Sequence, residues 1–132
     1  MDAACYCDFD PPETISVRTH VAKIRHVCSE CHGWILPGER YALTWGVWDG
    51  PPQTFRRCPD CQSVLDWIDA HQPCFCWTFT SLLSEARDAM YYLAEEDVPG
   101  MRMEMGRLLV RCRRRGRERR GEIMQAAQGD KT

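Results

Sequence analysis

The sequence predicts an α+β fold in which a β-hairpin and a helix form a first module and two more α-helices follow. Three observations lead to this prediction. Apolar residues alternate with polar ones over 15–21, a turn dipeptide separates two β-prone runs at 41–48 and 53–57, and apolar residues recur at helical spacing from 64 onward. With 132 residues, the chain has room for one ordinary domain or a small domain with an appendage.

The strands are indicated by alternation and by turn residues. The alternation at 15–21 has the period of a half-buried strand. The run at 41–48 ends in Asp49-Gly50, a dipeptide that favours a hairpin turn. The strand that pairs with this run is therefore expected at 53–57.

The three helices are bounded by residues that start or stop helices. Pro59 suits a first helical turn, where its missing N–H costs nothing, and this helix is expected to end near His71. Ser81 is expected to cap the second helix, and the break at 98–100 separates it from the third. The apolar positions of the three helices are Val64, Leu65 and Ile68; Leu82, Ala86, Met90 and Leu93; and Met101, Met105, Leu108 and Cys112.

The charge is divided unevenly along the chain. Residues 1–100 contain seven Lys/Arg and fifteen Asp/Glu, a net charge of −8, whereas residues 101–132 contain ten and four, a net charge of +6. This asymmetry is typical of an acidic body with a basic arm. We expect a β-hairpin and helix module at 1–79, a helical region with a basic last helix at 80–127, and a tail at 128–132.

Two CxxC pairs, Cys28/Cys31 and Cys58/Cys61, are the strongest chemical signal in the sequence. A CxxC turn directs both sulfurs to one side, so two such pairs supply the four thiolates that Zn²⁺ prefers. The first pair precedes the expected hairpin, and the second opens the expected helix, whose N-terminal dipole favours thiolate charge. The spacing predicts a structural zinc site, and this order of elements resembles the treble-clef zinc finger, with 28–61 LIM-like in spacing.

Four further cysteines form two CxC pairs, Cys5/Cys7 and Cys74/Cys76. In an extended chain, residues i and i+2 point to the same side, so each pair can direct two sulfurs together. The two pairs are expected to form a second zinc site that ties the N-terminal arm to the start of the helical region. The alternative is that they are small buried apolar residues. One Zn²⁺ is thus expected, and two if this second set binds metal.

Several segments also resemble small zinc proteins encoded by bacteriophages and prophages. The residues that resemble them are 1–8, 26–31, 37–41, 48–50 and 73–77. The likeness covers about residues 1–80 and does not include the arginine-rich end. The resemblance implies a phage context and zinc, but it implies no reaction.

The last helix contains a run of arginines that suggests a phosphate-binding surface. On a helix, several of them form one basic stripe that can follow a nucleic-acid backbone with salt-dependent affinity. The alternatives are a solvated or frayed helix end, which Gly116 and Gly121 favour, and docking on acidic residues of the body such as Asp66, Asp69 and 95–97. The residues expected to contact nucleic acid or a partner are Arg107, Arg111, Arg114, Arg115 and Arg119.

These features together favour a non-enzymatic zinc-binding protein that contacts nucleic acid through its basic C-terminal arm. The alternative is a protein-binding module, such as an anti-CRISPR-like inhibitor of a host defence or an inhibitor of a transcription complex. In that case the acidic body would imitate nucleic acid. The C-terminal helix also offers a route to a homo-oligomer.

Catalysis and membrane association are not expected. A treble-clef nuclease would need histidines on the hairpin and the next helix, yet 41–57 has none and His71 stands alone. No apolar run approaches the ~20 residues of a membrane span, and 1–5 lacks the features of a secretory signal. We therefore expect a cytoplasmic protein, located in the host cytoplasm if phage-encoded, whose cysteines bind metal rather than form disulfides.

Overall fold

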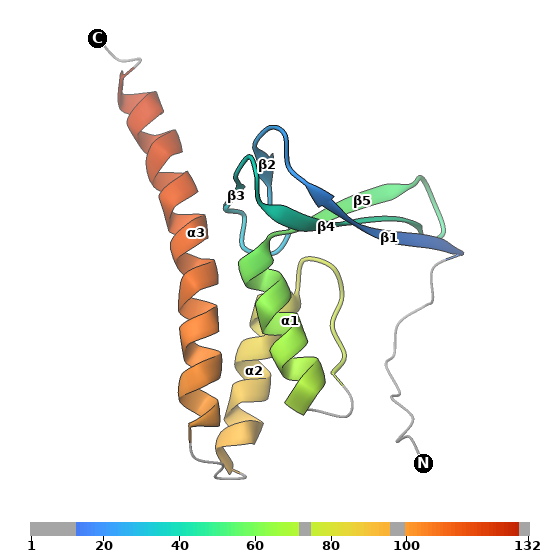
Figure 1. Cartoon of the computed structure of the whole chain (residues 1–132), viewed down its shortest axis with the longest axis vertical. Helices are drawn as coiled ribbons and strands as arrows, with labels where there is room; N and C mark the ends of the chain where they lie inside the picture. The colour runs from blue at the N-terminus through green and yellow to red at the C-terminus, as the bar shows by residue number, and fades with distance from the viewer. Residues whose placement is uncertain (1–12, 72–74, 96–99, 130–132) are drawn as a thin grey trace.

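The computed structural model describes residues 13–71, 75–95 and 100–129, and within these ranges the α+β class is confirmed (Figure 1). Two short strands that the sequence did not predict lie on either side of the first CxxC pair. The elements are, in order, β1 (Thr14–Val21), β2 (His26–Val27), β3 (Trp34–Ile35), β4 (Arg40–Val47), β5 (Gln53–Arg57), α1 (Pro59–His71), α2 (Leu82–Glu95) and α3 (Met101–Gly129).

The strands form two antiparallel sheets. Strand β4 lies between β1 and β5 in a three-stranded sheet, and β2 pairs with β3 in a separate ribbon. The predicted hairpin is confirmed, since Asp49 and Gly50 link β4 to β5 with positive φ angles of 50° and 157°. The β2–β3 ribbon was not predicted, because each of its strands has only two residues and such a short strand shows no alternation of apolar and polar residues.

The three helices pack against one another, and α3 runs past α1 to reach the β2–β3 ribbon (Figure 1). Helix α1 has the predicted bounds, and its predicted apolar positions are buried. Helix α3 extends to residue 129, and its buried face continues beyond the predicted Met105 and Cys112 to Gly116. Leu109 rather than Leu108 is the fully packed leucine of α3, while the side chains of Leu93 and Met101 lie outside the described residues.

One hydrophobic cluster joins the β2–β3 ribbon to all three helices. Ile35, Val64, Ile68, Leu82 and Met105 are all completely buried in it. The long last helix is therefore part of the main core and not an appendage that leaves the body. Only its C-terminal end projects past the remaining elements (Figure 1).

Strand β1 is present as predicted, but it is not half-buried. Ile15, Val17 and Val21 are 49%, 58% and 53% exposed. The physical reason is that β1 is an outer strand, whereas α1 contacts the sheet at β4. Alternation in the sequence thus identified the strand but could not show that its apolar face is left uncovered.

An aromatic cluster covers the β5 end of the sheet. The rings of Phe55 and Phe79 stack with centroids 4.5 Å apart, and Trp48 meets both rings edge-on at 6.0 and 5.7 Å. Trp77 packs edge-on against Phe79 at 5.3 Å. These rings therefore hold the segment before α2 against the sheet.

Candidate metal centre

Four cysteines converge from two parts of the chain. Cys28 and Cys31 lie in the turn between β2 and β3, while Cys58 directly precedes α1 and Cys61 lies in its first turn. All four side chains are buried. The structure therefore brings together the four residues that the CxxC spacing selected.

The four sulfur atoms are spaced as ligands of one metal ion would be. Every Sγ lies within 4.8 Å of the other three. The Sγ atoms of Cys28 and Cys61 are 3.8 Å apart, and so are those of Cys31 and Cys58. A tetrahedral ion with bonds of about 2.3 Å to sulfur requires edges of about 3.8 Å. The cluster can accordingly hold a metal ion.

Backbone N–H groups surround the sulfurs. The N–H groups of Glu30 and Cys58 donate to Cys28 Sγ at 3.4 and 3.3 Å. Cys31 Sγ accepts from the N–H of Gly33, and Cys58 Sγ accepts from the N–H of Cys61, both at 3.4 Å. These donors stabilise negative charge on sulfur, which is the form that binds a metal.

The thiols do not ionise independently of one another. Hydrogen bonds from the thiols of Cys31, Cys58 and Cys61 hold the pKa of Cys28 far below its usual range. Hydrogen bonding with Cys28 raises the pKa of Cys58, and hydrogen bonding with Cys112 and then Cys28 raises that of Cys61. One thiolate is thus favoured at the expense of its neighbours, and a bound divalent ion would displace the remaining protons.

Glu30, inside the first CxxC turn, connects the cysteine cluster to α2. Its carboxylate is only 6% exposed and accepts from the N–H groups of Thr80 and Leu82 at 2.8 and 3.0 Å. Burial raises the pKa of Glu30. The predicted cap Ser81 directly precedes α2, and its carbonyl accepts from Glu85 N–H, but its hydroxyl bonds to Thr78. The carboxylate that meets the start of α2 therefore comes from a distant residue, which local sequence does not reveal.

Helix α3 approaches the first CxxC turn so closely that two glycines are required. A Cβ on Gly33 would lie 2.6 Å from the carbonyl carbon of Arg115, and a Cβ on Gly116 would overlap the carbonyl oxygen of Cys31. The sequence suggested that Gly116 marks a frayed helix end. Its position instead allows the helix backbone to lie against the first CxxC turn.

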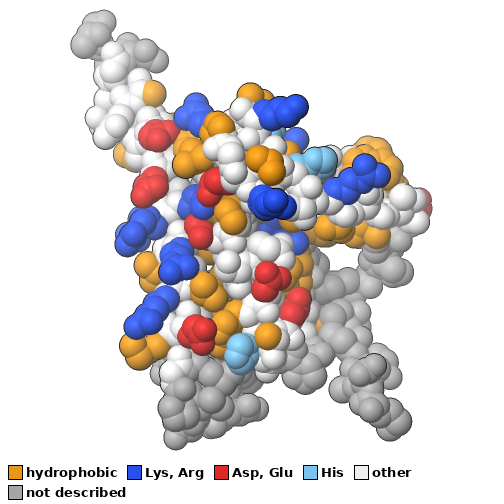
Figure 2. Space-filling model, viewed as in Figure 1, with side chains coloured by type: hydrophobic (Ala, Val, Ile, Leu, Met, Phe, Trp, Pro, Cys, Tyr) orange, Lys and Arg blue, Asp and Glu red, His pale blue; other side chains and the backbone are white. Residues whose placement is uncertain are grey.

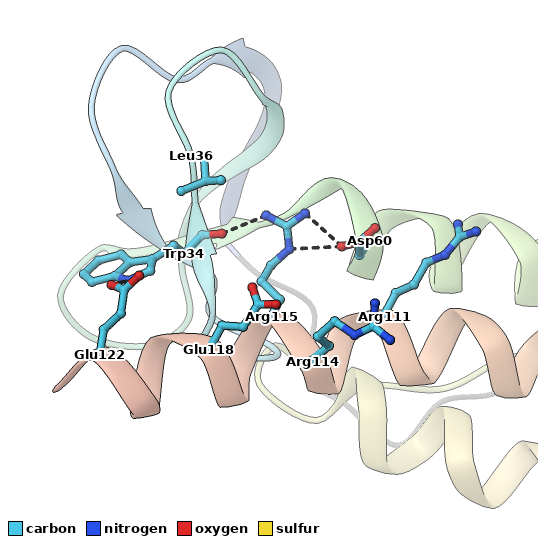
Figure 3. Close-up of a pocket in the computed structure, with 8 residues that line it drawn as sticks. All are labelled: Trp34, Leu36, Asp60, Arg111, Arg114, Arg115, Glu118 and Glu122. Atoms are coloured by element: carbon cyan, nitrogen blue, oxygen red, sulfur yellow. Dashed lines mark hydrogen bonds and ion pairs between the residues drawn. The ribbon is translucent and has the colours of Figure 1, made fainter. Parts of the chain in front are cut away.

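Arg115 fastens this contact with five hydrogen bonds, and Figure 3 draws those to Trp34 and Asp60. Its guanidinium donates to Trp34 O at 2.7 Å, to both oxygens of Glu39 at 2.6 and 3.0 Å, and twice to Asp60 Oδ2 at 3.0 and 2.8 Å. The bonds to Glu39 raise the pKa of Arg115 and lower that of Glu39. Arg115 was predicted to contact nucleic acid or a partner, and in the structure its guanidinium donors are used inside the protein.

Trp34 provides a second connection to α3. The guanidinium carbons of Arg25 and Arg119 lie 4.0 and 4.9 Å from the centre of its ring. The indole N–H donates to Glu122 at 2.7 Å, and Arg119 donates to the carbonyl of His32 at 3.2 Å. Arg119, another predicted contact residue, is thus half-buried against the β2–β3 ribbon.

The other predicted contact residues of α3 face solvent. Arg107, Arg111 and Arg114 are exposed, and none of them forms a hydrogen bond or ion pair within the described residues. Arg111 and Arg114 line a hollow of about 320 Å³ next to Arg115 (Figure 3). The predicted stripe is therefore divided between free arginines and the internally bound Arg115 and Arg119.

The second cysteine set is left as a prediction. Cys5, Cys7 and Cys74 lie outside the described residues. Cys76 is disulfide-bonded, which departs from the expectation that the cysteines bind metal rather than form disulfides, and it therefore lacks the free thiolate that a metal site needs. Cys112, which belonged to neither set, is completely buried in the core.

Comparisons with known proteins assign neither a family nor a function to the chain. The chain matches no protein-family model, no curated protein and no solved structure. Among the described residues, no helix combines the length and the apolar character that crossing a membrane requires.

Proposed function

We propose that the four-cysteine cluster binds one structural Zn²⁺ and that the surrounding module is a treble clef. Four sulfur ligands at tetrahedral spacing match the preference of Zn²⁺, and a set without an open position is typical of a structural ion. The order of CxxC turn, hairpin and helix opened by the second pair supports the treble-clef assignment.

We further propose that this zinc-bound scaffold presents α3 to nucleic acid. The observation that supports this most directly is a set of exposed arginines on α3 that have no hydrogen bond or ion pair within the described residues. Basic side chains are spaced along the α3 side of the molecule (Figure 2). The set consists of Arg107, Arg111, Arg113, Arg114, Arg117 and Arg120.

A rigid helix suits this role. The helix is about 43 Å long at about 1.5 Å per residue, and Gly116 and Arg115 fix its middle against the metal centre. Because the backbone is held in place, binding costs only the ordering of arginine side chains. Binding to phosphates would give affinity without base specificity.

The test compares two triple variants by fluorescence anisotropy with labelled DNA and RNA over a range of salt concentrations. Changing Arg107, Arg111 and Arg114 to Gln should weaken binding and reduce the salt slope by about 0.9 for each phosphate that is no longer neutralised. The matched control changes Arg18, Arg40 and Arg87, which are exposed on other elements. Equal losses of affinity in both variants, or no binding by the wild type at low salt, would contradict the proposal.

A protein partner is the second candidate, and the exposed face of β1 favours it. Ile15, Val17 and Val21 lie on one face of an outer strand with about half of each side chain exposed. Apolar residues grouped in this way are typical of interaction sites. In the phage context that the resemblance implies, the partner would be a host defence or transcription complex.

Affinity capture from nuclease-treated lysate tests this candidate. A protein that remains bound after nuclease treatment and is lost with Val17→Asp supports it. Recovery of nucleic acid alone, which disappears with nuclease, contradicts it.

A further inference from the structure

A hollow of about 500 Å³ lies between α3, the first CxxC turn and the beginning of α2. Arg113, Arg117 and Arg120 line it from α3, and His32 and Leu83 line it from the other two elements. Arg113, Arg117 and Arg120 are spaced at i, i+4 and i+7, and this spacing places all three on one side of the helix. None of the three belongs to the stripe predicted from the sequence.

Within the described residues, no hydrogen bond or ion pair involves Arg113, Arg117 or Arg120. The acidic residue that lines the hollow is Glu30, whose two oxygens already accept from Thr80 and Leu82 N–H groups. Within the described residues, three positive charges therefore face one concavity, and none of them pairs with Glu30.

The wall of this hollow is held firmly. Gly116, which lies between Arg113 and Arg117, touches the carbonyl of Cys31, and Arg115 binds Glu39 and Asp60. The arginines thus extend from a fixed stretch of backbone, which lowers the ordering cost of binding a ligand.

We propose that this hollow binds a phosphate group. Guanidinium groups are planar forks whose paired N–H donors match phosphate oxygens, and three of them can satisfy a dianion. The proposal deepens the proposed function, and the biological role of the hollow rests on that function. In a nucleic-acid complex, the hollow would fix one phosphate beside the metal centre while Arg107 and Arg111 bind others.

The first experiment titrates the full-length metal-bound protein with inorganic phosphate and with a short oligonucleotide by calorimetry. The variant changes Arg113, Arg117 and Arg120 to Gln, and the control changes Arg18, Arg40 and Arg87, which are exposed on other elements, to Gln. We expect phosphate affinity to fall at least tenfold in the variant and less than twofold in the control. Equal losses, or no loss in the variant, would overturn the proposal.

The oligonucleotide arm separates this proposal from the proposed function. Phosphate binding that depends on the hollow, without oligonucleotide binding, would support the hollow and reject the nucleic-acid role. Oligonucleotide binding that is unaffected by changes at Arg113, Arg117 and Arg120 would support nucleic-acid binding by α3 and reject phosphate binding in the hollow.

A second measurement needs no variant. Phenylglyoxal modifies arginines, and mass spectrometry locates the modified positions in the wild-type protein. Inorganic phosphate should protect Arg113, Arg117 and Arg120 and leave the exposed Arg18 and Arg40 reactive. Uniform protection, or none, would overturn the proposal.

Discussion

The two flanks of α3 use the same residue type for different purposes. On one flank, Arg115 binds two carboxylates and a carbonyl, and Arg119 packs against Trp34. On the other flank, Arg113, Arg117 and Arg120 face a hollow and have no partner within the described residues. An arginine-rich helix is therefore not one surface, because the atoms that its arginines meet decide which of them are available.

Disrupting the proposed metal site should have the largest effect, since α3 packs against the first CxxC turn at Gly116. Cys58→Ser removes one of four ligands, and we expect a loss of several kcal/mol in the free energy of unfolding. Thermal unfolding monitored by circular dichroism measures it. The control Ile68→Val truncates a completely buried side chain of α1 outside the cluster and should retain the metal, and equal metal loss in both would contradict the assignment.

The close approach of α3 is tested by Gly116→Ala. The added methyl would overlap the carbonyl oxygen of Cys31, so we expect a loss of about 1–3 kcal/mol in denaturant unfolding. Gly121→Ala is the matched control, because its Cβ meets nothing within 4 Å. It should stabilise the helix by up to about 1 kcal/mol, and a similar effect of both changes would argue against tight packing at Gly116.

Arg115→Met and Arg113→Met compare the two flanks directly, because each removes one guanidinium and the free energy of unfolding can be measured for both. Arg115 is 15% exposed on its side chain, and its loss leaves Glu39 and Asp60 without their cation. We expect a loss of roughly 1–2 kcal/mol, discounted for the partial exposure of the carboxylates. Arg113→Met should change the free energy of unfolding by less than about 0.5 kcal/mol. If urea unfolding ranks the two variants the other way, the flanks have been misassigned.

A smaller effect is expected from pH. Bonds from Arg115 hold the pKa of Glu39 below its usual 4.5, so its contribution to stability is present above that pH and is lost as pH falls. The difference in unfolding free energy between wild type and Glu39→Gln should be constant near neutrality and shrink below pH 4.5. Glu30, whose pKa burial raises, acts in the opposite direction but is present in both proteins and cancels. A difference that grows on acidification would contradict the ion pair.

Local patterns predicted the parts of this protein that depend on neighbouring residues. The CxxC spacing identified the four clustered cysteines, Asp49-Gly50 identified the hairpin, and Pro59 identified the start of α1. In each case, the chemistry of a few adjacent residues was sufficient.

Interactions between distant residues could not be predicted in this way. Glu30 meets the start of α2 across 52 positions, and Arg115 reaches Glu39 across 76. In sequence, Arg115 looks like Arg113, so the run of arginines gave no means of separating them. The signal that could have separated them is the apolar stripe of α3. When this stripe is continued from Cys112 to Gly116, Arg115 lies on one side of it and Arg113 on the other.

The central claim is that Cys28, Cys31, Cys58 and Cys61 hold one Zn²⁺ that fixes the surface on which α3 docks. Zinc-edge X-ray absorption, combined with elemental analysis of protein purified without chelator, tests it most directly. The account predicts at least one zinc ion per chain in an all-sulfur environment of four ligands at about 2.3 Å. Protein that is fully folded with less than stoichiometric metal, or with fewer than four sulfur ligands, would contradict it.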